Sequence, residues 1–196
     1  MNLTSSRFAA AIGMNPHCSR QRLFRQLTGA ENVVFVAAMQ WGIDHEADAV
    51  AGVEAALGIL FDFTGRFQEH FTMKSGGYEF GTTPDGVRER LEMHWPAPKR
   101  VGLEVKCPQN MWDEPPAYYI PQLIGQARIA ELHEIYFSAW TPGEQRIWLF
   151  KYRPSLWEWM EPLLHGFMEN LDNGIEPPRQ KKPELPEFEM EELSGE

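Results

Sequence analysis

The hydrophobic residues of the chain follow two different periods, one helical and one extended. Steps of three and four are the period of an amphipathic helix. They predict helices over residues 4–12, 19–27, 34–57, 117–132 and 156–171. The two short helices begin at serine or threonine and end near glycine, as is common at helix ends. Pro162 falls inside the last helix, where it is expected to bend the helix or start a new one.

A period of two, with successive side chains on opposite faces, is typical of a β-strand. It predicts strands over residues 59–63, 66–72, 78–81, 87–93 and 101–105, and a hairpin of strands 135–140 and 146–152. Helices lie before, between and after these strands. The pattern therefore predicts an α/β fold with a mixed sheet flanked by helices.

The composition describes a protein that can bury a sizeable core. The chain has 196 residues, 43% of them hydrophobic, which suits one compact domain. After Gly174 the chain becomes proline-rich and acidic, so we assign the domain to residues 1–175 and expect residues 176–196 to be mobile. No apolar run approaches the ~20 residues needed to span a bilayer. No signal region is evident either, and a cytoplasmic protein is the simplest interpretation.

The two cysteines, Cys18 and Cys107, are too few for a disulfide framework or for a zinc or iron–sulfur site. The formal net charge of −10 at first argues against a nucleic-acid partner. The charge is unevenly distributed, however. Residues 184–196 hold six glutamates and no base, whereas residues 1–30 hold four arginines and no acid. The acidic balance therefore does not exclude DNA.

The candidate chemistry lies between residues 82 and 108. In a strand, Glu104 and Lys106 share one face while Val105 points to the core. If Asp85 opens a neighbouring strand, two carboxylates and an ammonium converge. Carboxylates suit Mg²⁺, which Mn²⁺ can replace, and a lysine beside such an ion can stabilise a phosphate or orient water.

Each half of this pattern has a structural alternative. Pro-Asp-Gly is a common turn sequence, and Glu-x-Lys can form a solvated strand face. Residues 101–105 are mostly apolar, however, and an unpaired charge is costly to bury there. The context therefore favours a functional site.

Glu46 is a third candidate carboxylate. The predicted helix 34–57 has an apolar stripe of Val36, Met39, Ile43, Val50 and Leu57. Glu46 falls at the helical step between the third and fourth of these, so we expect it to face inward with a partner or a metal. His45 lies about 100° around the helix and is expected to be a neighbour, not a ligand.

These residues resemble the PD-(D/E)xK motif of metal-dependent nucleases. Thr-Pro-Asp-Gly and Leu-Glu-Val-Lys-Cys-Pro are similar to the lambda-exonuclease or YqaJ-type viral recombinase family, which includes alkaline exonucleases, and the similarity covers about residues 3–157. The resemblance implies a restriction-endonuclease-like core. It also implies metal ligation by Asp85, Glu104, the Val105 carbonyl and Glu46, with Lys106 as the catalytic lysine.

The resemblance further implies 5′-to-3′ digestion of one strand of duplex DNA from its end, to mononucleotides. It implies a ring-shaped homotrimer and a single-strand annealing protein as partner. Ser6, Thr83, Tyr119 and Gln122 match positions that contact DNA or a terminal phosphate, and Gln126 lies one helical turn beyond. The family's arginine before Thr-x-Ser has no counterpart here, so Arg7 or Arg20 would have to replace it.

Three alternatives stand beside this hypothesis. A non-catalytic DNA-binding module would not need the motif carboxylates and lysine, all of which are present. An iron–sulfur relative would need more cysteines than the chain has. A sequence-specific endonuclease shares the core motif, and only a comparison of circular with linear duplex separates it from an exonuclease.

Overall fold

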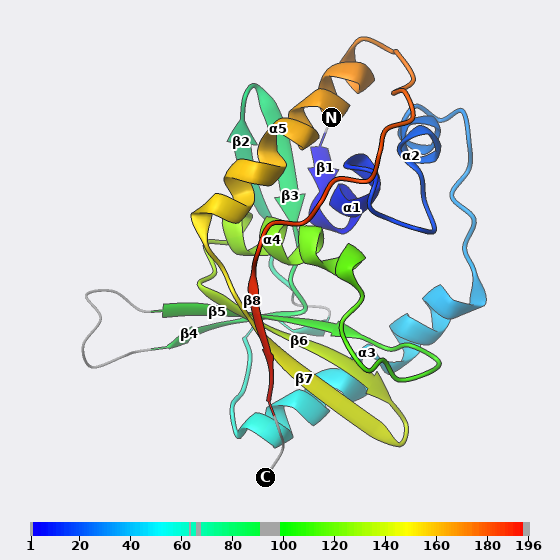
Figure 1. Ribbon diagram of the computed structural model, residues 1–196. Helices are drawn as coiled ribbons and strands as arrows, with labels where there is room; N and C mark the ends of the chain where they lie inside the picture. Colours follow the sequence, from blue (N-terminus) through cyan, green and yellow to red (C-terminus); the bar gives the residue numbers. More distant parts are fainter. Residues whose placement is uncertain (1, 63, 66–67, 91–98, 194–196) are drawn as a thin grey trace.

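The computed structural model describes residues 2–62, 64–65, 68–90 and 99–193, and it contains two sheets (Figure 1). The strands are β1 (Asn2–Thr4), β2 (Phe71–Ser75), β3 (Tyr78–Thr82), β4 (Gly86–Arg90), β5 (Lys99–Lys106), β6 (Glu134–Thr141), β7 (Glu144–Lys151) and β8 (Glu189–Glu192). The helices are α1 (Phe8–Ala11), α2 (Arg20–Leu27), α3 (Ala37–Leu57), α4 (Ile120–Ile129) and α5 (Pro154–Asp172), with 3₁₀ turns η1 (Ser5–Arg7) and η3 (Ala117–Tyr119). In this described part, no helix has the length and apolarity to cross a membrane.

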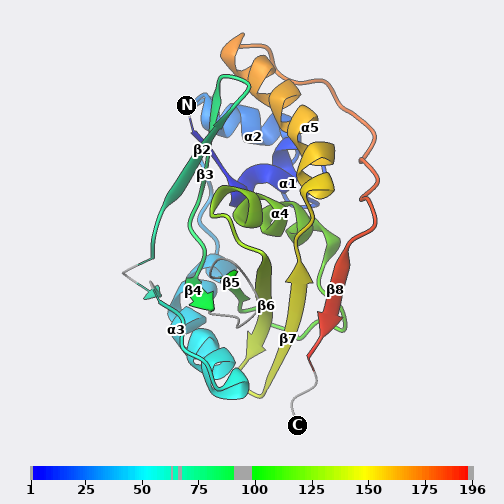
Figure 2. The same ribbon diagram turned by 90° about the vertical axis from the view of Figure 1, so that its left-hand side faces the viewer.

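The larger sheet has the order β4-β5-β6-β7-β8, and the smaller has the order β1-β3-β2. In the larger sheet β5 pairs antiparallel with β4 and parallel with β6, so the sheet is mixed, as predicted. Helix α4 covers one face of this sheet and α3 covers the other, while α1, α2 and α5 lie with the smaller sheet (Figures 1 and 2). The three candidate carboxylates, Glu46, Asp85 and Glu104, and the candidate lysine Lys106 lie where α3, α4, β4 and β5 meet.

Two hydrophobic clusters hold these layers together. The larger joins α1, α4, α5 and the sheets, and its fully buried aromatic side chains are Phe8, Phe80, Phe137, Phe150 and Phe167. The smaller lies between α3 and the other face of the large sheet, where Val53 contacts the strand that carries Leu103 and Val105. The smaller cluster includes residues of β5 itself, and Leu132 of the larger cluster lies against Gly102 of the same strand, so β5 is packed by both clusters.

The predicted helix over residues 4–12 is helical from Ser5 onward, but its first turn is a 3₁₀ turn and not an α-helix. Asn2–Thr4 pairs in parallel with β3, and the chain then passes through η1 into the four-residue helix α1. The hydroxyl of Ser5 is buried and hydrogen-bonded to that of Thr82 at 2.7 Å. A sheet contact from a distant part of the chain therefore overrides the local capping signal.

The predicted strand over residues 59–63 is also wrong where the structure describes it. Asp62 forms only an isolated bridge, with Val87, and Leu60 is 74% exposed. Residue 63 lies outside the described residues, as do residues 66–67 of the next predicted strand, which begins only at Phe71. An alternating pattern of side chains does not by itself produce a strand, because a strand also needs a neighbouring strand to pair with.

The first half of α3 differs from the expected inward stripe. Met39 and Ile43 are 45% and 61% exposed, and the buried residues of the helix are Ala49, Val50 and Val53. Its buried residues therefore all lie in the second half, while in the first half the ring of His45 packs against Trp140 of β6, with 5.4 Å between the ring centroids. Helix α5, in contrast, continues through Pro162 as one helix.

The composition of residues 176–196 predicts a mobile segment, whereas the structure packs it along the body of the protein. Pro177 is buried, and the side chains of Leu185, Phe188 and Met190 contact the larger cluster. Residues 189–192 form β8, which pairs antiparallel with β7 at the edge of the sheet (Figure 2). The few apolar residues of the segment are enough to hold it in place, because they pack on a surface that the rest of the chain has already formed.

Candidate active site

Asp85 lies directly before β4 and is held against β5. The register pairs Gly86 with Leu103, and the backbone N–H of Asp85 donates to the Leu103 carbonyl at 2.9 Å. The backbone N–H of Val105 donates to Oδ2 of Asp85 at 2.7 Å. The predicted convergence of Asp85 with the strand that carries Glu104 is therefore present.

The Glu104 carboxylate is buried, with 2% of the residue exposed. Its Oε1 accepts hydrogen bonds from Nζ of Lys106 and, at 2.6 Å, from Nε2 of Gln122. Its Oε2 accepts a hydrogen bond from Nε2 of Gln126. A solvated strand face does not describe this arrangement, because protein donors have replaced water around the charge.

Glu46 reaches the same group of residues from α3 through Gln68. Nε2 of Gln68 donates to Oε1 of Glu46 at 3.0 Å and to Oδ1 of Asp85 at 3.2 Å. One amide nitrogen therefore lies between two carboxylates from distant parts of the chain. It supplies partial positive charge to both, as a full cation would do more strongly.

Burial and neighbouring charge change the proton affinities of Asp85 and Lys106. Burial raises the pKa of Asp85 well above its usual range, and the charge of Glu104 raises it further. Burial lowers the pKa of Lys106, but the carboxylates of Glu104 and Asp85 outweigh burial and raise it above its ordinary value. Lys106 is therefore charged at neutral pH, and one ammonium faces several carboxylates.

Tyr119 contacts the lysine from the start of α4. Its ring centroid lies 5.5 Å from Nζ of Lys106, a distance at which the face of an aromatic ring attracts a cation. Trp112 packs beside the same ring, with 5.3 Å between the ring centroids. Burial raises the pKa of the Tyr119 phenol, so it remains protonated and can donate a hydrogen bond.

The donors of this site suit a hard divalent cation, since they are carboxylate oxygens beside a backbone carbonyl. Within the described ranges, no three carboxylate, imidazole or thiol groups stand together as a ready metal cage. Lys106 and Gln122 engage Oε1 of Glu104, while Gln68 lies between the other two carboxylates. The residues therefore fit a cation that displaces some of these donors.

A comparison with protein families decides the classification. The family model described as YqaJ-like viral recombinase domain matches residues 1–133. The chain belongs to this family. Its resemblance to the lambda-exonuclease and YqaJ group is thereby confirmed, and this YqaJ-like protein is an enzyme, a nuclease of the lambda-exonuclease type.

Solved structures confirm the predicted fold. The alkaline exonuclease LHK-Exo from Laribacter hongkongensis is 24% identical, with a TM-score of 0.65 over 89% of this chain and 90% of that one. The structure of LHK-Exo in complex with dAMP is 23% identical, with a TM-score of 0.65 over 89% of each chain. The structure of SSO0001 is 11% identical, with a TM-score of 0.58 over 91% of this chain and 79% of that one. At these identities the likeness establishes the restriction-endonuclease-like fold. No curated protein matches the chain.

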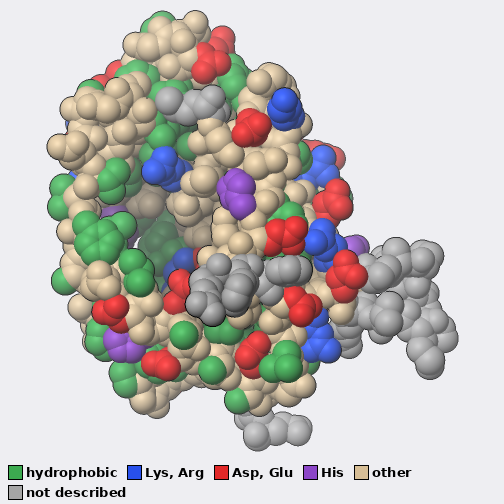
Figure 3. All heavy atoms as spheres, turned by 180° about the vertical axis from the view of Figure 1, so that it is seen from behind, with side chains coloured by type: hydrophobic (Ala, Val, Ile, Leu, Met, Phe, Trp, Pro, Cys, Tyr) green, Lys and Arg blue, Asp and Glu red, His purple; other side chains and the backbone are tan. Residues whose placement is uncertain are grey.

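In this YqaJ-like protein, two of the predicted DNA-contacting residues, Tyr119 and Gln122, contact residues of the carboxylate site. Gln122 contacts Glu104, and Tyr119 contacts Lys106. Ser6 and Thr83 are exposed, and each follows one member of the bonded pair Ser5–Thr82. The face opposite to that of Figure 1 has a hollow, around which hydrophobic, acidic and basic side chains gather (Figure 3).

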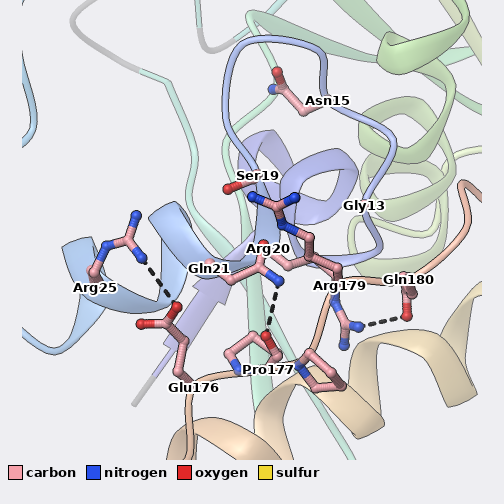
Figure 4. Close-up of a pocket in the computed structure, with 11 residues that line it drawn as sticks. Gly13, Asn15, Ser19, Arg20, Gln21, Arg25, Glu176, Pro177, Arg179 and Gln180 are labelled. Atoms are coloured by element: carbon pink, nitrogen blue, oxygen red, sulfur yellow. Dashed lines mark hydrogen bonds and ion pairs between the residues drawn. The ribbon is translucent and has the colours of Figure 1, made fainter.

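The two candidate arginines have different surroundings. Arg7 is exposed and follows Ser6 directly. Arg20 is 8% exposed, donates from Nε to the Ala11 carbonyl at 2.8 Å, and contacts Gln180. It lines a separate hollow of about 670 Å³ between α2 and residues 176–180 (Figure 4). Among the described residues, none of the hydrogen-bond partners of Arg20 belongs to the carboxylate site.

Sequence patterns placed Gln126 on the polar face of the helix with Tyr119 and Gln122, but they did not identify Gln68. The structure buries the side chain of Gln126 completely, against Glu104. Gln68 lies in a segment predicted as a strand, and its partners are 22 and 17 positions away. No local pattern marks such a bridge.

Proposed function

We propose that the chain is a Mg²⁺-dependent exonuclease that digests one strand of linear double-stranded DNA from 5′ to 3′. Its products are mononucleotides and a single strand for annealing-type recombination. The observation that carries the proposal is the buried contact of Glu104 with Lys106 beside Asp85. Family membership supports DNA as the substrate, and likeness to LHK-Exo, described as an alkaline exonuclease, supports attack at an end.

Asp85, Glu104, the carbonyl of Val105 and Glu46 would hold the cation, Mg²⁺ or Mn²⁺. The chemistry that a divalent cation supplies in such a site is Lewis acidity, which favours ionisation of water and offsets charge on a departing oxygen. The raised pKa of Asp85 agrees with this assignment, because added positive charge would stabilise its ionised form.

Lys106 is the residue that this proposal places against the reacting phosphate. Its ammonium is charged at neutral pH, and it can donate to a phosphate oxygen or to the attacking water. Contacts with Glu104 and with the ring of Tyr119 limit the positions of Nζ. The N–H of Val105 meanwhile holds Oδ2 of Asp85, which leaves Oδ1 on the side of Gln68 and Glu46.

Contacts to the DNA backbone would come from Ser6, Thr83, Tyr119 and Gln122, with Arg7 as the charged partner of a 5′-phosphate. Hydroxyl, amide and guanidinium donors suit phosphate oxygens, and such contacts set the register of the strand without reading its sequence. Family membership also supports a homotrimeric ring and a single-strand annealing protein as partner.

The test uses linear duplex labelled at either 5′ end, with closed circular duplex as the matched control. We expect labelled mononucleotide from the start of the reaction with Mg²⁺ or Mn²⁺ and none with EDTA. Lys106→Ala should lower the rate by ~10²-fold or more, which is typical when a preorganised electrostatic group is removed. Cleavage of the circle would establish an endonuclease instead, and undiminished digestion by Lys106→Ala would show that the motif is not catalytic.

A further inference from the structure

The two oxygens of the Glu104 carboxylate have different partners. Oε1 accepts from both Lys106 and Gln122, and Oε2 accepts from Gln126. The two glutamines lie four positions apart on α4 and therefore share one face of the helix. One helix thus reaches both oxygens of a carboxylate that lies on β5.

The two glutamines differ in exposure. Gln122 is half-buried, whereas Gln126 is 0% exposed and cannot contact a substrate in this structure. Oε1 of Gln126 is also buried, and no described residue donates a hydrogen bond to it. A buried amide carbonyl without a donor is unfavourable, so packing alone does not explain glutamine at this position.

The orientation of the Gln126 amide follows from its neighbour. Rotating the amide by half a turn would place its oxygen against Oε2 of Glu104, and both atoms are acceptors. The observed orientation directs the amide N–H groups at the carboxylate and leaves the amide oxygen without a donor. The Gln126 side chain therefore provides a hydrogen bond to Glu104 while its own amide oxygen receives none from the described residues.

We propose that Gln126 is a positioning residue for the nuclease site. Its amide fixes the position of Oε2 of Glu104, so that Oε1 is the oxygen presented to Lys106 and to a divalent cation. The inference rests on the proposed function. The terminal torsion of a glutamate is soft, and hydrogen bonds to a ligating carboxylate typically change metal affinity or activity by about 10- to 100-fold.

Gln122 has the opposite relation to the cation. It shares Oε1 with Lys106, and two donors engage the two lone pairs of that oxygen. A cation that binds Oε1 must displace one donor, and the half-buried Gln122 can turn outward. Removing Gln122 therefore removes a competitor of the cation, whereas removing Gln126 removes the support of the cation's ligand.

The experiment compares Gln126→Met with Gln122→Met by calorimetric titration with Mn²⁺ and by steady-state digestion of linear duplex. We expect Gln126→Met to bind Mn²⁺ about 10- to 100-fold more weakly. Its kcat should fall at limiting Mn²⁺, while its KM for DNA stays unchanged. Gln122→Met should show no loss of Mn²⁺ affinity but a higher KM for DNA. Melting in EDTA establishes that both variants are folded.

If Gln126→Met does not fold, Gln126→Asn, which is too short to reach Oε2, should show the same loss of affinity. Wild-type Mn²⁺ affinity in a folded Gln126 variant would overturn the inference, and so would equal losses in the Gln122 and Gln126 variants. A wild-type protein that neither binds Mn²⁺ nor digests DNA would instead refute the proposed function.

Discussion

Replacement of Lys106 with methionine should destabilise the cation-free protein as well as abolish cleavage. Methionine has a similar length but no charge, so it leaves Glu104 buried without its ammonium partner. The side chain of Glu104 is 3% exposed and that of Lys106 is 25% exposed, so water can replace the lysine only in part. Loss of this contact therefore leaves an incompletely compensated buried charge.

The two glutamines moderate the cost. Removing one partner of a buried ion pair typically costs 3–5 kcal/mol, but here Gln122 and Gln126 still donate to the carboxylate. We therefore expect a loss of about 1–3 kcal/mol in the free energy of unfolding. For a chain of this size, each kcal/mol corresponds to roughly 2–4 °C in melting temperature.

The assay is urea unfolding in EDTA for the wild type, Lys106→Met, Glu104→Gln and the double variant. The double variant removes both charges, so it should recover most of the stability lost in Lys106→Met, while its cleavage stays at least ~10²-fold below wild type. Mg²⁺ or Ca²⁺ should stabilise Lys106→Met by supplying the missing positive charge. If Lys106→Met is as stable as the wild type in EDTA, or if the double variant recovers nothing, the ion pair does not stabilise this site.

Two further predictions concern charge in the site and the C-terminal segment. Because the pKa of Asp85 is raised in the folded state, the folded protein binds more protons, and the cation-free protein should lose stability as pH rises above about 4. Asp85→Asn should abolish this dependence and be the more stable protein at pH 8 in EDTA; an unchanged pH dependence would contradict the assignment. Deletion of residues 175–196 removes β8 and the packing of Phe188 against Phe150, so it should lower the melting temperature and promote association through the exposed edge of β7, as seen by light scattering. A truncated protein that stays monodisperse with wild-type melting would show that the segment does not stabilise the sheet.

The amino-acid sequence by itself determined the elements whose signals are local. The alternation of residues 101–105 confined Glu104 and Lys106 to one face of a strand, and β5 contains that strand. The helical period after residue 117 placed Leu123 and Ala127 on the buried face of α4. These patterns suffice because a strand or helix fixes the direction of each side chain through its own backbone geometry.

Only the tertiary structure decided what each face contacts. Met39 and Ile43 share a helical stripe with Val50, yet both are exposed whereas Val50 is buried. The C-terminal segment is ordered by β7 and not by its own composition. Likewise, Gln68 and Gln126 belong to the site because α3, α4 and β5 converge there. Periodicity shows which side chains point the same way, whereas their partners depend on contacts between segments far apart in the chain.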